Sequence, residues 1–333
     1  MRSRLRPGAV AIALVVVAAL AGCGKTGPTA TTPKKPDRPV STEVPHLPTP
    51  TPELPATATN PDGSTVEITD VSRIVPLWGN LAEIVFALGL GDNVVARDVT
   101  ATFPEAAHLP KVTQGHDVSA ETVLNQRPTL VLAAPDTGPP EALDAIRKAG
   151  VPVLVIKEPN SIEDVRTRIE TLADALGVHD SGVELGERTM AEIAEVQQAI
   201  PTDVPPPRVA FLYMRGQAGV YLIAGPDSGA DSMIEAAGGI DAGTEMGLTR
   251  PFTPLTSEAL VKAAPEVILM TTTGLASVGG IDGLREIPGI AQTPAGVSKR
   301  VVTMEDGLLY SFGSRTPEAL ADLIELIHGT PGS

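Results

Sequence analysis

The sequence predicts an α/β fold of two similar lobes, each with a central, largely parallel sheet flanked by helices, joined by a single long helix. Three observations predict it. Apolar strand-like runs alternate with helical runs, segments of the first half align with segments of the second, and a helical pattern without a strand candidate occupies the middle. The expected strands are 73–78, 93–97, 129–133, 151–156, 208–213, 266–271 and 300–304, and the expected helices are 80–89, 119–126, 140–149, 161–176, 230–237, 256–264 and 316–328.

An internal repeat supports the two lobes. Residues 119–132 (SAETVLNQRPTLVL) align with residues 256–269 (TSEALVKAAPEVIL), and this places Glu121 opposite Glu258. A chance match of two amphipathic helices is the alternative, but the shared Glu and Pro positions disfavour it. Two further pairs follow in the same order, 73–78 with 208–213 and 83–89 with 232–238, and the second half carries an insertion at 216–226 that is typical of a hairpin.

The repeat also predicts where a ligand binds. Ligands of α/β sheets bind beyond the carboxyl ends of the strands. Two lobes that face each other therefore share one cleft. Trp78 and Tyr213 end equivalent strands, so we expect them on opposite walls of that cleft.

The long helix divides the folded part. From Asp180 to Ile200 the chain shows only a helical pattern, which ends at Pro201. We therefore expect a first lobe at 62–178, a linking helix at 179–201 and a second lobe at 202–333.

The N-terminal residues predict export and anchoring. A basic start is followed by an apolar stretch at 8–21 and by Cys23, the single cysteine. Small residues before a cysteine at this place resemble the bacterial lipoprotein signal, although an ordinary signal peptide with an incidental cysteine is the alternative. We expect a signal peptide at 1–22, then a lipidated Cys23 with a Pro/Thr-rich tether at 23–61, on the outer face of the cell membrane.

The composition disfavours several function classes. The 333 residues carry a formal net charge of −15 and a pI near 4.8, which disfavours nucleic acid as a partner. Zinc-type Cys/His spacing, a phosphate loop and a hydrolase nucleophile motif in a strand–turn–helix setting are all missing from the sequence. We therefore expect a protein that is not an enzyme and has no catalytic cofactor.

The stretch FLYMRG at 211–216 carries the most specific chemistry. Tyr213 and Arg215 are separated by one residue, so in an extended strand both side chains point to the same side. A nearby guanidinium stabilises the anionic form of a phenol. An ordinary packing pair at a sheet edge is the alternative.

With these residues in place, the region from about 62 to 330 resembles the substrate-binding lipoproteins of ABC importers. It is similar to the class III periplasmic binding proteins, whose lobes are joined by one rigid helix and which carry haem, cobalamin or siderophores. The segments GHDVSAETVL, FLYMRGQAGVYLIAG and SFGSRTPEAL resemble the haem carriers of actinobacterial haem-uptake systems, the HmuT type.

The resemblance implies how haem would be held. His116 and Tyr213 match the two axial iron ligands, and Arg215 matches the residue that supports the tyrosine. A surface or capping role is the alternative for His116, and Tyr221 on the hairpin is a second choice for the tyrosine ligand. Further cleft or propionate contacts are expected from Trp78, Tyr221, Arg250 and Arg315, with solvated arginines as the alternative for the last two.

The resemblance also implies partners. The family delivers its cargo to an ABC permease with its ATPase subunits, and docks through one acidic residue on an early helix of each lobe. Glu83 matches in the first lobe, and Asp231 or Glu235 is expected to serve in the second. We expect a monomer that carries haem as transported ligand, with a ferric siderophore or cobalamin as the alternative cargo and a protein-binding surface lipoprotein as another class of function.

Overall fold

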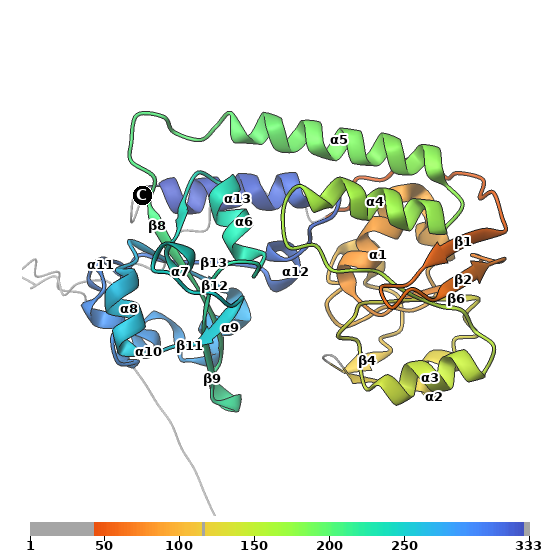
Figure 1. The fold of residues 1–333 in the computed structure, drawn as a ribbon, viewed down its shortest axis with the longest axis horizontal. Helices are drawn as coiled ribbons and strands as arrows, with labels where there is room; N and C mark the ends of the chain where they lie inside the picture. Colours follow the sequence, from red (N-terminus) through yellow and green to blue (C-terminus); the bar gives the residue numbers. More distant parts are fainter. Residues whose placement is uncertain (1–42, 115–116, 330–333) are drawn as a thin grey trace, which may run out of the picture. The chain divides into compact units, whose positions relative to one another are not determined.

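Two sheets with parallel cores, one in each half of the chain, form the framework of the computed structural model, which describes residues 43–114 and 117–329 (Figure 1). In the first lobe, β3 (Ile74–Pro76), β6 (Leu130–Ala133) and β7 (Val153–Val155) pair in parallel in the order β3-β6-β7. Helices α1 (Gly79–Val85), α2 (Ala120–Leu124), α3 (Pro140–Lys148) and α4 (Asp164–Ala175) complete this lobe, with the short hairpins β1–β2 (Ala56–Thr59, Thr65–Ile68) and β4–β5 (Thr113–Gln114, Asp117–Val118).

The second lobe has a larger, mixed sheet in the order β11-β9-β8-β12-β13, and a short β10 also pairs with β8. Its strands are β8 (Arg208–Arg215), β9 (Val220–Ala224), β10 (Ile240–Asp241), β11 (Phe252–Pro254), β12 (Val267–Thr271) and β13 (Val301–Met304). The antiparallel pair β8–β9 confirms the hairpin expected at 216–226. The helices of this lobe are α6 (Ala230–Ala236), α7 (Ala242–Glu245), α8 (Ser257–Ala263), α9 (Thr272–Ser277), α10 (Gly280–Glu286), α11 (Pro294–Ser298), α12 (Asp306–Leu309) and α13 (Thr316–His328).

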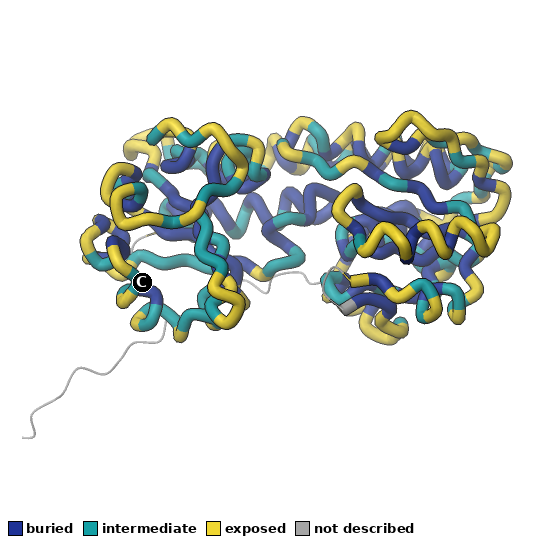
Figure 2. The backbone as a smooth tube through the Cα atoms, turned by 60° about the horizontal axis from the view of Figure 1, so that its bottom comes forward, coloured by how far each residue is buried: buried dark blue, intermediate teal, exposed yellow. Residues whose placement is uncertain are grey.

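The long helix α5 (His179–Gln197) connects the two lobes. It packs against α4 of the first lobe and α13 of the second, as Figure 1 shows. The largest hydrophobic cluster runs through both lobes and includes Ile74, Ile193 and Phe211. Two smaller clusters cover the other face of each sheet, so the central strands β6 and β12 are buried along their whole length. Figure 2 shows buried residues, in dark blue, in both lobes.

The internal repeat is present in the register of the strands. In the first lobe Ile74 pairs with Leu130, and in the second the aligned residues Val209 and Val267 pair in the same way. The helices before these strands are also capped alike, since Ser119 accepts a hydrogen bond from Thr122 N and Thr256 accepts one from Ala259 N. The same arrangement of helix and strands is therefore built twice.

Two details of the expected fold are wrong. Residues 93–97 form no strand, because only the isolated bridge between Ile74 and Val94 extends the sheet. The tether does not run free to residue 61, because Val44 and Leu47 are buried and Ala56–Thr59 forms β1. Backbone hydrogen bonds fix the proline-rich stretch to the first lobe, from Leu47 N to Ala87 O at 2.8 Å and from Glu53 N to Gly177 O at 2.7 Å.

A glycine makes this close approach possible. Gly177 has a φ of 70°, and a Cβ on it would lie 2.4 Å from the Glu53 carbonyl oxygen. Any other residue would meet both left-handed strain and a clash there. The helix that Gly177 ends and the segment that packs on it therefore depend on each other.

Candidate ligand-binding site

The strand β8 places the tyrosine and the arginine together, as the sequence predicts. Leu212 and Met214 point into the second-lobe cluster, whereas Phe211 and Tyr213 pack on the opposite side, with the cluster that runs through both lobes. The Arg215 guanidinium carbon lies 5.4 Å from the centre of the Tyr213 ring, at cation–π distance. Tyr213 is half-buried and Arg215 is exposed, so the pair stands at the boundary between core and solvent.

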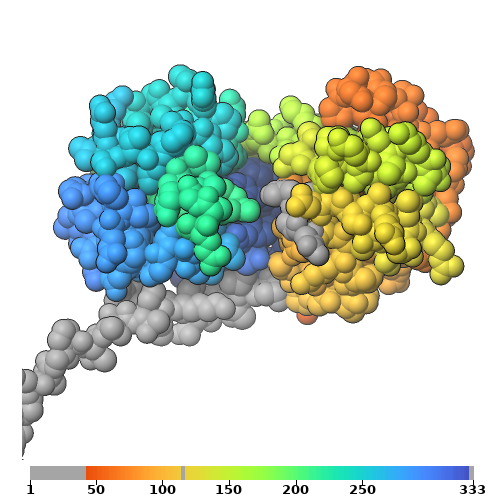
Figure 3. Space-filling model, turned by 90° about the horizontal axis from the view of Figure 1, so that it is seen from below, coloured from red at the N-terminus to blue at the C-terminus, as the bar shows by residue number. Residues whose placement is uncertain are grey.

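A cavity of about 430 Å³ opens in front of this pair. The first lobe lines it with Trp78, Asn80, Thr100, Asp136, Glu158, Pro159 and Asn160, and the second with Tyr213, Arg215, Leu222, Asp227, Ser228, Phe252, Thr271, Asp306, Gly307, Tyr310 and Phe312. Figure 3 shows the hollow between the first lobe, orange to yellow, and the second, green to blue. The cavity thus lies where the carboxyl ends of both sets of strands meet.

Aromatic side chains gather in this cavity. Five of the nine aromatic residues of the chain line it, namely Trp78, Tyr213, Phe252, Tyr310 and Phe312. The Trp78 indole donates to Thr137 Oγ1 at 2.9 Å, which fixes its ring, and Tyr213 lies 6.0 Å from Phe252 between ring centres. In a chain with only 3% aromatic residues, this concentration favours a large, flat, apolar ligand.

The charges around the cavity are mostly negative. Asp136, Glu158, Asp227 and Asp306 line it, and Arg215 is its one cationic side chain among the described residues. Burial, and then the charge of Asp136, raises the pKa of Glu158, while Arg168 opposes the shift. A ligand with its own carboxylates would therefore avoid the floor of the cavity and turn them towards solvent.

Buried hydrogen bonds lie next to the cavity and involve two of its lining residues, Asn80 and Tyr310. Arg168 of α4 donates to Asn80 Oδ1 at 3.0 Å and to Ser311 O at 3.4 Å, and burial lowers its pKa to about 10. Asn80 Nδ2 in turn donates to Tyr310 O at 3.4 Å. These bonds join the first lobe to the loop of the second lobe that carries Tyr310. Burial raises the pKa of Tyr310.

The structure contradicts the roles predicted for Glu83 and Arg315. Glu83 is 1% exposed and Arg315 is 8% exposed, and they form an ion pair of 2.9 Å between α1 and the start of α13. Glu83 also accepts from Arg315 N at 3.0 Å and from Ser314 Oγ at 3.3 Å. Glu83 therefore cannot present a carboxylate to a docking partner, and Arg315 is not available to a ligand.

Two further predicted contacts lie outside the cavity. Tyr221 on β9 packs against the second-lobe cluster and does not line the cavity. Arg250 is exposed just before β11 and does not line it either. Of the predicted contacts, Trp78 and Tyr213 meet across the cavity with Arg215, whereas His116 and Cys23 lie outside the described residues.

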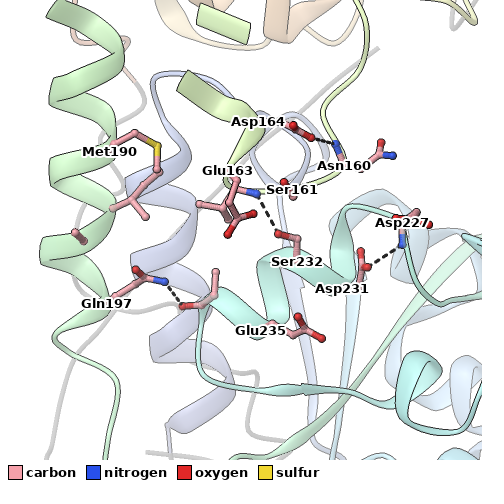
Figure 4. Close-up of a pocket in the computed structure, with 14 residues that line it drawn as sticks. Asn160, Ser161, Glu163, Asp164, Met190, Gln197, Asp227, Asp231, Ser232 and Glu235 are labelled. Atoms are coloured by element: carbon pink, nitrogen blue, oxygen red, sulfur yellow. Dashed lines mark hydrogen bonds between the residues drawn. The ribbon is translucent and has the colours of Figure 1, made fainter. Parts of the chain in front are cut away.

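Asp231 and Glu235 line a different hollow, of about 700 Å³, between the start of α4, α5 and α6 (Figure 4). Its walls hold five carboxylates, and no aromatic or cationic side chain of the described residues lines it. Asp231 accepts from Asp227 N at 2.8 Å, and Ser232 accepts from Ile162 N of the first lobe at 3.0 Å. This hollow suits neither an anionic nor a flat aromatic ligand, and we take the aromatic cavity as the candidate site.

A pair of exposed carboxylates was not among the docking residues predicted from the sequence. Glu121 and Glu258 are both exposed, in the first turns of the equivalent helices α2 and α8. In an α/β unit, a helix that precedes a parallel strand begins near the sheet edge at which such strands end, and ligands bind at that edge. The aligned positions of these two glutamates in the repeat are the signal that could have found them.

In residues 43–114 and 117–329 no three His, Cys, Asp or Glu side chains are grouped so that they could hold a metal ion. None of the helices in the same ranges is both long enough and apolar enough to cross a membrane.

Comparisons with known proteins point to one family. A family model described as periplasmic binding protein matches residues 74–308. The solved structure of the heme binding protein HmuT is 39% identical, with a TM-score of 0.80 over 86% of this chain and 94% of that chain. The periplasmic heme-binding protein RhuT from Roseiflexus sp. RS-1, in apo form, is 42% identical, with a TM-score of 0.73 over 78% of this chain and 98% of that chain.

Solved variants and curated relatives add detail. Separate variants of HmuT change a histidine, a tyrosine and an arginine to alanine, and the tyrosine and arginine are two positions apart there. The uncharacterized ABC transporter substrate-binding lipoprotein YvrC of Bacillus subtilis is 26% identical over 80% of this chain and 84% of its own length. A cobalamin-binding protein of Halobacterium salinarum is 28% identical over 63% of this chain and 58% of its own length.

The buried ion pair generates a stability prediction. Glu83→Gln leaves the Arg315 guanidinium buried without a counter-charge, so the free energy of unfolding should fall by about 3 kcal/mol in urea denaturation. The control is Asp144→Asn, which removes an exposed ion pair of 3.1 Å with Arg147 and should cost less than about 1 kcal/mol. If both variants lose the same free energy of unfolding, Glu83 and Arg315 do not form a buried ion pair.

Proposed function

The chain belongs to the periplasmic binding protein family, and from that premise we propose that it binds haem outside the cytoplasm and delivers it to an ABC importer. Tyr213 beside Arg215 in an aromatic cavity is the observation that carries this proposal. The phenol can bind Fe(III) while the aromatic rings pack on the apolar macrocycle. The likeness to solved haem-binding proteins at 39% and 42% identity supports the same cargo.

Each wall of the cavity has its own task in this proposal. Tyr213 of the second lobe binds iron as the phenolate, and Arg215 stabilises that negative charge. His116 of the first lobe supplies the opposite axial ligand as a neutral imidazole, as the resemblance implies. The tyrosine and arginine changed in the HmuT variants have the same spacing as Tyr213 and Arg215, which supports the pair as a unit.

The acidic walls determine how haem would lie. The two propionates are negative, and the carboxylates of Glu158 and Asp306 repel them from the interior of the cavity. We infer that the propionates face solvent, near the exposed Arg215, while the apolar edge enters first. This orientation keeps the charged groups of the ligand hydrated.

Cobalamin is the second candidate cargo. Curated relatives from Halobacterium and Vibrio are named as cobalamin-binding or vitamin B12-binding proteins, at 28% and 23% identity. A corrin already carries its cobalt with nitrogen ligands and does not need an anionic phenol from the protein. Tyr213 next to Arg215 therefore favours haem, and competition between haemin and cyanocobalamin in a titration separates the two cargoes.

The iron ligand gives a direct prediction. Tyr213→Phe removes the phenolate while it keeps the ring, so haemin titration should show a shifted Soret band and an affinity lower by at least about tenfold. Tyr221→Phe is the matched control, because this phenol lies outside the cavity, and it should keep the wild-type spectrum. The opposite pattern, with only Tyr221→Phe affected, would place the ligand on the hairpin.

For delivery, we propose that Glu121 and Glu258 dock on the permease, in place of Glu83 in the first lobe and of Asp231 or Glu235 in the second. A permease with one basic residue facing each lobe would meet two exposed carboxylates at equivalent positions beside the cavity. The repeat positions and the exposure of both residues support this choice.

The combined change of Glu121→Arg and Glu258→Arg should leave haemin binding within about twofold of wild type and reduce uptake in reconstituted vesicles by at least about tenfold. The combined Glu184→Arg and Glu195→Arg is the matched charge reversal, on the exposed side of α5. If it reduces uptake as much as the pair does, the effect comes from net charge and the docking proposal is wrong.

We also propose that acylation at Cys23 holds the protein at the outer face of the cell membrane. Cys23→Ser removes the only thiol of the chain, so metabolic palmitate labelling should disappear and the protein should leave the membrane fraction. Label that persists on the serine variant would refute the anchor.

A further inference from the structure

Tyr310 is a second phenol of the cavity that the proposed function leaves without a role. It follows α12, and its ring packs edge-on against Phe211, with 5.8 Å between ring centres and 81° between ring planes. Phe211 lies two residues before Tyr213 on the same face of β8, so Tyr310 stands on the side of the strand that carries Tyr213. Both tyrosines line the same cavity.

The Tyr310 hydroxyl is buried and has no hydrogen-bond partner among the residues that the structure describes. A buried donor of this kind costs about 1–3 kcal/mol, and buried phenols usually have a partner. The carboxylate of Asp306 lines the same cavity, but it accepts instead from Thr273. The hydroxyl is thus a donor that the ligand-free protein does not use.

The backbone around Tyr310 is held from the first lobe. Asn80 donates to Tyr310 O at 3.4 Å, and Arg168 donates to Ser311 O at 3.4 Å. Phe312, two residues later, has a φ of 37°, a left-handed conformation for a bulky residue. The backbone that carries the Tyr310 side chain is therefore held in place, and a side chain that positions a ligand needs such a rigid backbone.

We propose that Tyr310 is a positioning residue, which donates its hydroxyl hydrogen to the phenolate oxygen of Tyr213 once that oxygen binds the iron of the ligand. Without ligand, the Tyr213 hydroxyl can both donate and accept, yet the Tyr310 hydroxyl forms no hydrogen bond with it. As an iron-bound phenolate, Tyr213 would carry only lone pairs and a negative charge, so it would attract the unused donor of Tyr310 more strongly. The hydrogen bond orients the phenolate and withdraws electron density from the iron–oxygen bond.

This inference rests on the proposed haem binding. It predicts different effects of Tyr310→Phe on the haem-free and on the haem-bound protein. Tyr310→Phe removes only the unused hydroxyl. The haem-free variant should melt at the wild-type temperature or above it, because no hydrogen bond is lost there. The haem-bound variant should show a shifted phenolate-to-iron charge-transfer band and a haem dissociation rate raised about tenfold.

The experiment compares wild type, Tyr310→Phe and the control Tyr221→Phe, each loaded with haemin, by absorption, resonance Raman of the iron–phenolate stretch and transfer of haem to apomyoglobin. Wild-type spectra and rates in Tyr310→Phe would overturn this inference and leave haem binding intact. A haem-free variant that melts several degrees lower would mark Tyr310 as a packing residue and also overturn it. Wild-type protein that binds no haemin would instead refute the proposed function.

Discussion

The buried ion pair between Glu83 and Arg315 is the constraint on which the rest of the cleft depends. It joins α1 of the first lobe to the start of α13 in the second, with 2.9 Å between the charged atoms. Such a pair adds little net stability compared with apolar packing, but either charge alone would be costly in that place. Its contribution is geometric, since the lobes must keep one arrangement for both charges to stay paired.

Neighbouring bonds extend that constraint to the cavity. Arg168 and Asn80 hold the backbone at Ser311 and Tyr310 from the first lobe, four to five residues before Arg315. The loop after α12 carries Tyr310 and Phe312, which line the cavity. This loop belongs to the second lobe, but hydrogen bonds from the first lobe hold it in place. A ligand that fills the cavity meets a surface already arranged by the buried network, which lowers the entropy cost of binding.

Much of this structure can be predicted from the sequence, and the parts that cannot share a physical reason. Strand and helix alternation, the repeat and the meeting of Trp78 with Tyr213 follow from local periodicity and from spacing within the repeat. The burial of Glu83 does not, because its partner Arg315 lies 232 residues away in the chain. The packed proline-rich segment before β1 was also missed, because it is held by backbone bonds and a close approach to Gly177 that composition does not reveal.

The absorption spectrum of the protein purified from a haem-replete host tests the central claim most directly. We predict a Soret band with the charge-transfer feature of a ferric haem bound by a phenolate, and this feature should be lost when Tyr213 is changed to phenylalanine. A colourless protein, or one with the spectrum of a corrin, would contradict haem as the cargo of this cleft.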